Sequence, residues 1–193
     1  MIVALLLTMV CCIVLGMGVP TTATYCIMAA TCAPILMSPD IGVEMLAAHF
    51  FVFYFGIVAD ITPPVALAAY AGAAIAKAGP MKTAFNASRL AIAAFIVPYI
   101  IAMNPAMLFI NTTIPEVVMI TISSIIGIFG VAAGLSGFVF RDMKWWERIL
   151  CIVGGLTLLV PGSLTDLIGL VLVGAVCVLG YQAAKKEKEM LAA

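Results

Sequence analysis

Two short polar segments interrupt an otherwise apolar sequence, and their residue types suit the binding of a small ion. They are Gly16–Thr22 (GMGVPTT) and Asp60–Pro64 (DITPP). Proline lacks an amide donor and clashes with the carbonyl four residues earlier, so Pro63 and Pro64 should leave the carbonyls of Ala59 and Asp60 without helical partners. Backbone carbonyls and threonine hydroxyls are hard oxygen ligands for a small cation, and the amide end of a following helix suits an anion.

The first segment repeats this logic. Pro20 should free the carbonyl of Gly16, and the glycines permit close approach. Thr21 and Thr22 could cap the helix that follows, as Thr62 could cap the next helix with Pro63 in its first position. We expect the tip of a re-entrant hairpin at Gly16–Thr22 and a broken helix at Asp60–Pro64. A plain turn between two crossings and a simple proline kink in a packed helix are the alternative interpretations.

Two ionisable residues lie near the second break. Asp60 is an acid inside an apolar span, where ionisable groups are expensive and indicate function. It could balance a bound cation, accept a coupling proton, or tune the field of a wet cavity, and the sequence leaves these three open. His49 lies among aromatic residues, in Ala47–Phe51 (AAHFF), and we interpret it as a hydrogen-bonded packing residue.

Composition identifies the medium that these segments occupy. Of 193 residues, 65% are hydrophobic and 9% are charged, whereas soluble domains carry about 25% charged residues. Uncharged runs cover 90–115, 117–140 and 167–184, lengths that match the roughly 17–25 residues of a membrane-spanning helix. We therefore predict an all-α integral membrane protein in a lipid bilayer. The net charge of zero gives no indication of a nucleic-acid partner.

The apolar segments predict the order of elements. We expect apolar arms at 1–15 and 23–37, a broken crossing at 43–76, and helices at 83–103 and 117–140 separated by a polar patch at 111–116. Two further arms, 146–160 and 164–181, flank Pro161–Ser163, and they could be two crossings or a second re-entrant pair. We divide the chain into a transport repeat (1–110), a membrane extension (111–184) and a soluble tail (185–193).

Basic residues predict the orientation, because cytoplasmic loops are enriched in Lys and Arg. If 1–37 is a re-entrant hairpin and the later helices alternate, Asp40, Glu44, Glu116 and Asp166 fall outside. All nine basic residues then fall inside, with a cytoplasmic C-terminus: Lys77, Lys82, Arg89, Arg141, Lys144, Arg148, Lys185, Lys186 and Lys188. Motifs of catalysis, such as HExxH or a GxSxG around Ser136, do not occur, so we do not expect an enzyme.

Several segments resemble the fused large permease of TRAP transporters of the TAXI type. The likeness rests on Gly16–Tyr25, Ala47–Phe55 and Ile61–Tyr70, and it continues through Pro98, Asn104–Ala106, Trp146–Arg148 and Pro161–Asp166. It covers nearly all residues from 16 to 180, with several separated motifs in order.

The resemblance implies an elevator-type importer in the bacterial inner membrane, built from inverted repeats that each supply a hairpin and a broken helix. A periplasmic substrate-binding protein would deliver organic anions, typically dicarboxylates, and a sodium gradient would usually drive import, with Na+ as the coupling ion and no other cofactor. The implied cation site comprises Gly16, Gly18, Thr21, Ala59, Asp60 and Thr62. The implied substrate contacts are Thr22, Pro63 and Pro64.

One departure from the family pattern concerns length. Full fused permeases are several times longer, with a scaffold and a first repeat ahead of the segment seen here. We therefore expect the chain to need that missing N-terminal repeat and scaffold as partners, and to neither bind nor transport substrate alone. Two other functions remain open: a non-transporting membrane scaffold subunit, or an ion-conducting subunit of a membrane enzyme with Asp60 as relay. The residues do not distinguish sodium from proton coupling.

Overall fold

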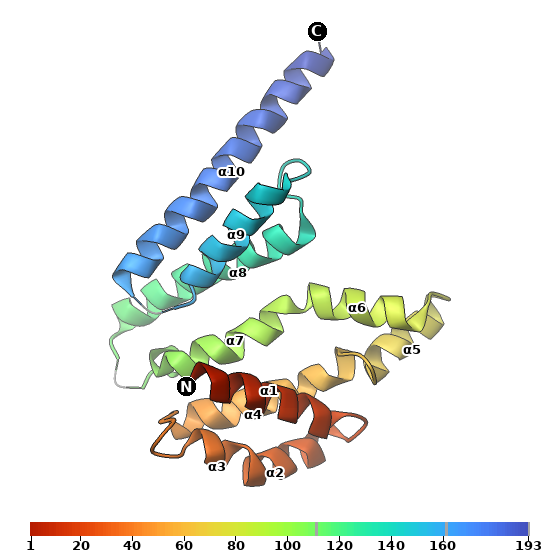
Figure 1. The fold of residues 1–193 in the computed structure, drawn as a ribbon, viewed down its shortest axis with the longest axis vertical. Helices are drawn as coiled ribbons and strands as arrows, with labels where there is room; N and C mark the ends of the chain where they lie inside the picture. Colours follow the sequence, from red (N-terminus) through yellow and green to blue (C-terminus); the bar gives the residue numbers. More distant parts are fainter. Residues whose placement is uncertain (111, 161, 193) are drawn as a thin grey trace. The chain divides into compact units, whose positions relative to one another are not determined.

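The computed structural model describes residues 1–110, 112–160 and 162–192, without the side chains of 163 and 186–192. Helices joined by turns make up nearly all of these residues, and no strand occurs among them (Figure 1). The chain divides into two compact units, Met1–Ile110 and Asn111–Ala193. The prediction of an all-α membrane protein is confirmed.

The first unit begins with a helical hairpin. Helix α1 (Ile2–Gly16) is 15 residues long, about 22 Å, which is shorter than the roughly 30 Å core of a bilayer. Gly18 carries the chain round the turn with a φ of 74°, in the left-handed region that glycine adopts readily. The returning arm, predicted as one piece, is divided at Cys32 into α2 (Thr21–Thr31) and α3 (Ala33–Leu36), with Pro34 in the first turn of α3.

The predicted broken helix follows. Helix α4 (Met45–Val58) starts at Glu44, whose carboxylate accepts hydrogen bonds from the amide N–H groups of Leu46 (2.7 Å) and Ala47 (3.2 Å). A 3-10 turn, η1 (Ala59–Ile61), ends it, and α5 (Leu67–Ile75) resumes after the two prolines. The expectation that Thr62 caps the second half with Pro63 in its first position was wrong, because α5 begins at Leu67 with Ala66 as its N-cap.

The predicted helix 83–103 is two helices. Helix α6 (Pro80–Leu90) and α7 (Ile92–Met103) are bent by 41° at the break between them, and a 3-10 turn, η2 (Pro105–Leu108), follows. Pro80 suits a first turn, where its missing N–H has no helical partner to lose. The Ser88 hydroxyl lies 3.1 Å from the Ala84 carbonyl, a back-bond that often bends helices.

The core of this unit surrounds α4. The rings of Phe51 and Phe55 lie 4.8 Å apart, and each contacts Tyr99 of α7, at 5.3 and 5.8 Å. On another side, buried residues of α1 and α2, including Leu5, Cys12 and Met28, complete the same cluster. The broken helix is thus held between the hairpin and α7.

The second unit contains α8 (Ile114–Ser136), α9 (Trp145–Thr157) and α10 (Ser163–Ala192). Helix α8 starts earlier than the predicted 117 because Pro115 fits its first turn. It ends at Ser136, and Gly137 caps it with a φ of 75°. The tail expected from 185 continues α10 as helix to Ala192. Pro161 lies outside the described residues.

Glycines set the packing of these three helices. A Cβ on Gly127 would lie 2.9 Å from the Gly155 carbonyl oxygen, and one on Gly134 would lie 2.7 Å from that of Arg148, so α8 and α9 run antiparallel. A Cβ on Gly169 would lie 2.6 Å from the Gly154 carbonyl oxygen. Small residues that let backbones approach closely are typical of helix packing in membranes.

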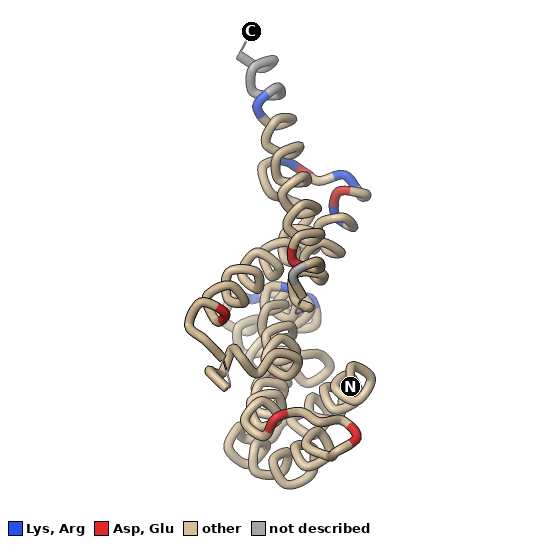
Figure 2. The backbone as a smooth tube through the Cα atoms, turned by 90° about the vertical axis from the view of Figure 1, so that its left-hand side faces the viewer, with Lys and Arg blue, Asp and Glu red and all other residues tan. Residues whose placement is uncertain are grey.

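Helices α8 and α10 are long and apolar enough to cross a membrane, and α6 with α7 would make a third crossing if the bent pair is one span. The charges lie mainly at helix ends and turns (Figure 2). Within the second unit, Arg141, Lys144 and Arg148 lie at one end of the α8–α9 pair, and Glu116 lies at the other end.

Candidate functional site

The hairpin tip and the helix break meet directly in the first unit. A Cβ on Gly16 would lie 2.9 Å from the Cβ of Ala59 and 3.1 Å from the Gly56 carbonyl oxygen. Glycine at this position therefore permits backbone contact between the end of α1 and the end of α4. The structure brings together two segments that the sequence places more than forty residues apart.

Most carbonyls at the break have found hydrogen-bond donors. The Ala59 carbonyl, expected to be free, accepts from the Thr62 amide (3.2 Å). The Thr62 hydroxyl donates to the Val58 carbonyl (2.7 Å), and the Ser88 hydroxyl donates to that of Ile61 (2.9 Å). The carbonyl of Asp60 accepts no hydrogen bond from the described residues. The prediction of unpartnered carbonyls thus holds for Asp60 and was wrong for Ala59.

The hairpin tip shows the same partial satisfaction. The Gly16 carbonyl was predicted to be free, but it accepts a long hydrogen bond from the Val19 amide (3.4 Å). Thr21 and Thr22 lie exposed in the first turn of α2 and do not cap it. The Thr24 hydroxyl instead donates to the Val19 carbonyl (3.2 Å) and stabilises the turn. A carbonyl oxygen has two lone pairs, so a single hydrogen bond leaves it able to coordinate a cation.

The remaining predicted residues surround this contact at different depths. Ala59 and Gly16 are buried, Asp60, Thr62 and Pro63 are half-buried, and Gly18 and Pro64 are exposed. Asp60 lies in η1, one residue beyond the Gly16–Ala59 contact. The structure therefore places the carboxylate, the Thr62 hydroxyl and the end of α1 in one region.

Charge distribution in this region follows from the helix ends. The C-terminal ends of α1 and of α4 with η1 converge here, and each helix C-terminus carries a partial negative charge of about half an electron. Asp60 adds a carboxylate. A cation is favoured between these ends, whereas the adjoining N-terminus of α2, with Thr21 and Thr22, favours an anion.

An open groove of about 680 Å³ borders the break, and sequence reasoning missed most of its lining. Thr62, Pro63 and Pro64 form part of it, and α6 and α7 supply Met81, Phe85, Ser88 and Phe95. From α5, the hydroxyl of Tyr70 donates to the Pro64 carbonyl. No local signal marks Ser88 or Tyr70, because each reaches the break only through the packing of a separate helix.

His49 takes the packing role expected of it. Its Nδ1 lies 3.1 Å from the Tyr25 hydroxyl, and Tyr25 also packs edge-on against Phe53 with ring centroids 5.7 Å apart. Together with Leu46 and Phe50, these side chains line a smaller apolar pocket between α2 and α4.

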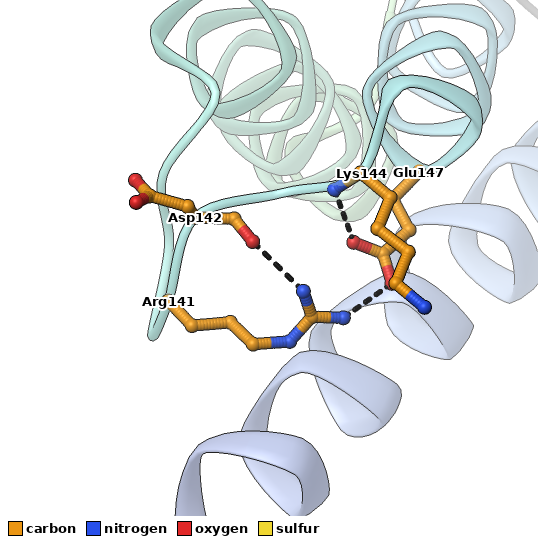
Figure 3. A network of polar contacts seen from close by, with 4 residues as sticks. All are labelled: Arg141, Asp142, Lys144 and Glu147. Carbon is orange, nitrogen blue, oxygen red and sulfur yellow. Dashed lines mark hydrogen bonds and ion pairs between the residues drawn. The ribbon is translucent and has the colours of Figure 1, made fainter. Parts of the chain in front are cut away.

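The charged end of the second unit is a polar network at the start of α9 (Figure 3). The Glu147 carboxylate, 3% exposed, accepts from the Lys144 amide (2.8 Å) and pairs with the Arg141 guanidinium (2.5 Å). Arg148 donates to the carbonyls of Gly134 (3.0 Å) and Leu135 (3.1 Å) at the end of α8. These contacts hold the α8–α9 turn closed, so Arg141, Glu147 and Arg148 have a structural role there.

Comparison with known proteins agrees with this architecture. The family model "Tripartite ATP-independent periplasmic transporter, DctM component" matches residues 1–117, and a domain of unknown function (DUF3394) matches residues 117–174. No curated protein and no solved structure matches the chain. The first match covers more than half of the chain and contains both the hairpin and the broken helix. The chain belongs to the DctM family, the large permease component of TRAP transporters.

Proposed function

We propose that this chain carries the ion-coupling site of an organic-anion importer, in which a sodium ion binds where the hairpin tip meets the broken helix. Family membership makes it a membrane permease component, not a member of an enzyme family. The observation that carries the proposal is the Gly16–Ala59 contact, which joins two helix C-termini beside Asp60 and Thr62.

Sodium ligands would come from both sides of this contact. The carbonyls of Gly16, Gly18 and Ala59, the Asp60 carbonyl or carboxylate, and the hydroxyls of Thr21 and Thr62 are the candidate oxygens. Sodium, like other hard cations, is matched by such oxygen donors, and broken helices supply them in transporters. The Asp60 carbonyl is the strongest single candidate, because it accepts no hydrogen bond from the described residues and coordination would satisfy it.

The substrate would bind next to the cation. The N-terminus of α2 presents its amides beside Thr22, and Pro63 and Pro64 line the groove on the other side of the break. A helix N-terminus favours carboxylate groups, so organic anions such as dicarboxylates are the proposed class. A bound sodium ion nearby would offset the charge of the incoming anion.

The family implies partnership with a periplasmic binding protein and a small membrane subunit. We propose the bacterial inner membrane as the location, with the C-terminus in the cytoplasm. We also propose that the chain acts together with an N-terminal permease repeat and scaffold and is inactive without them, since one repeat provides half of the inverted pair.

Replacement of Thr62 by Ala in the complete permease tests the cation site. Uptake of a dicarboxylate into proteoliposomes, with the binding protein present, is measured against sodium concentration at constant pH and ionic strength. We expect Thr62→Ala to raise the half-saturating sodium concentration about tenfold, the effect of losing one ion-bound hydroxyl worth roughly 1.5 kcal/mol.

Thr31→Ala is the matched control, because the Thr31 hydroxyl also bonds the carbonyl four residues earlier (2.8 Å) but lies at the far end of α2. It should leave sodium dependence unchanged. If uptake does not depend on sodium and is driven by a pH gradient instead, the proposal is wrong. Loss of that pH-driven uptake in Asp60→Asn would then assign proton coupling to Asp60.

A further inference from the structure

Ser88 of α6 reaches the helix break from a separate part of the first unit. Its hydroxyl donates to the Ile61 carbonyl (2.9 Å) across 27 residues of sequence. The same hydroxyl lies 3.1 Å from the carbonyl of Ala84 in its own helix. It has one proton, so the shorter contact to Ile61 is the better of the two.

This bond completes the fixation of one peptide plane. The Ile61 carbonyl has no amide partner three residues on, because Pro64 has no N–H. The carbonyl oxygen of Ile61 and the amide of Thr62 belong to one planar unit. Ser88 holds its oxygen, and the Ala59 carbonyl holds its N–H (3.2 Å). With both ends held, the plane between Asp60 and the Thr62 side chain cannot rotate freely.

We propose that Ser88 is a positioning residue for the cation site, and the proposal rests on the sodium site suggested above. Ser88 does not itself ligate the ion. It keeps the Ile61–Thr62 peptide oriented so that the Asp60 carbonyl and the Thr62 hydroxyl remain available on either side of that peptide. Ser88 also lies two residues before Leu90, where α6 ends and the 41° bend follows. The bond therefore links the angle between α6 and α7 to the geometry of the ion site.

Three variants of the complete permease test this role. Ser88→Ala removes the donor and should raise the half-saturating sodium concentration about fivefold, the magnitude of one net hydrogen bond. Ser88→Thr keeps the hydroxyl, and the open groove that Ser88 lines has room for the added methyl group, so it should restore the wild-type value. Thr83→Ala is the control on the same helix, because the Thr83 hydroxyl bonds the Gly79 carbonyl of its own turn (3.0 Å).

Sodium titrations of uptake and of thermal unfolding in detergent, with choline replacing sodium, separate the outcomes. A merely structural serine would lower the melting temperature of Ser88→Ala without moving its sodium half-saturation, and that result would overturn the positioning role. If the wild-type permease itself shows no sodium response, the proposed ion site fails. If the wild type and Thr62→Ala differ in sodium dependence while Ser88→Ala matches Thr83→Ala, the ion site stands and this inference fails.

Discussion

At the scale of single residues, the absence of a side chain at Gly16 determines how the tip meets the break. A Cβ at position 16 would lie 2.9 Å from the Ala59 Cβ and 3.1 Å from the Gly56 carbonyl oxygen, so there is no room for a methyl group. Gly18, by contrast, needs glycine for its φ of 74° and has open space around it. The two glycines of the same segment therefore serve different purposes: one permits close approach and the other permits the turn.

Replacing Gly16 by Ala should separate the tip from the break and weaken sodium-dependent uptake at least tenfold. The added methyl group would force a backbone shift, a kind of overpacking that destabilises by about 1–3 kcal/mol. Gly72→Ala is the control, since nothing lies within 4 Å of that position. Adding Ala59→Gly to Gly16→Ala removes the opposing Cβ and should recover part of the activity. Wild-type sodium dependence in Gly16→Ala would contradict the direct contact.

The sequence predicted where the backbone breaks but not how its polar groups are satisfied. Proline acts locally, so Pro20, Pro63 and Pro64 located both interruptions. The hydrogen-bond donors of Ser88 and Tyr70 come from α6 and α5, and no rule of local spacing indicates them. The predicted threonine caps failed for a related reason. The Thr62 hydroxyl bonds back to the Val58 carbonyl at the end of α4, and the next helix begins only at Leu67.

At the scale of elements, the start of α9 depends on a buried ion pair. Glu147 accepts from the Lys144 amide and pairs with Arg141, whose Nε is buried without a partner among the described residues. The pair lies at the N-terminal start of α9, whose 13 residues span about 20 Å. This explains why the sequence left 146–181 undecided: α9 is too short to read as a crossing, yet it packs as a full member of the bundle.

Glu147→Ala should destabilise the second unit by about 3 kcal/mol, because it leaves a largely buried guanidinium unpaired and removes the acceptor of an amide. Thermal unfolding of the purified protein in detergent measures the effect. Glu116→Ala is the control, since that exposed carboxylate bonds the Thr112 hydroxyl (2.9 Å) at the opposite end of α8. Combining Arg141→Met with Glu147→Leu should recover most of the loss. An unstable double variant would show that the surrounding packing, not the charge pair, sets the stability.

Element boundaries show the same division between local and non-local causes. Pro80, Pro115 and Gly137 start or end helices by local rules, and these rules explain the observed bounds of α6 and α8. The bend between α6 and α7 has no proline or glycine at its break. The bend lies close to Ser88, whose hydroxyl contacts a carbonyl of the helix break as well as one in its own helix. The periodicity of residues 83–103 therefore could not reveal the bend.

At the scale of the whole molecule, charge placement predicts how the protein lies in the membrane. In the first unit, the acidic turn with Asp40 and Glu44 and the basic turn with Lys77 and Lys82 lie at opposite ends of the α4–α5 run (Figure 1). In the second unit, Arg141, Lys144 and Arg148 gather where α8 ends and α9 begins. The side chains of Lys186 and Lys188 lie outside the described residues.

A green fluorescent protein fused after Ala193 should fluoresce, and alkaline phosphatase at the same position should be inactive, because positively charged ends stay in the cytoplasm. Alkaline phosphatase fused after Thr112, before α8, should be active. Helix α8 crosses once and the α9–α10 pair then leaves and returns, so the two fusion points lie on opposite sides of the membrane. If alkaline phosphatase were active after Ala193 and inactive after Thr112, the assigned orientation would be inverted. The proposed ion site would then be reached from the other side of the membrane.

The Gly16–Ala59 contact also limits how such a protein can open and close. A hairpin that opened away from the broken helix would need free space between them, and here Gly16 packs closely against the Ala59 methyl group and the Gly56 carbonyl. We therefore expect the hairpin and the broken helix to move together as one rigid body. The ion would then reach alternate sides of the membrane when this body slides against a stationary neighbour. The surface around the unit would have to permit that movement, while the ion site within it would stay unchanged.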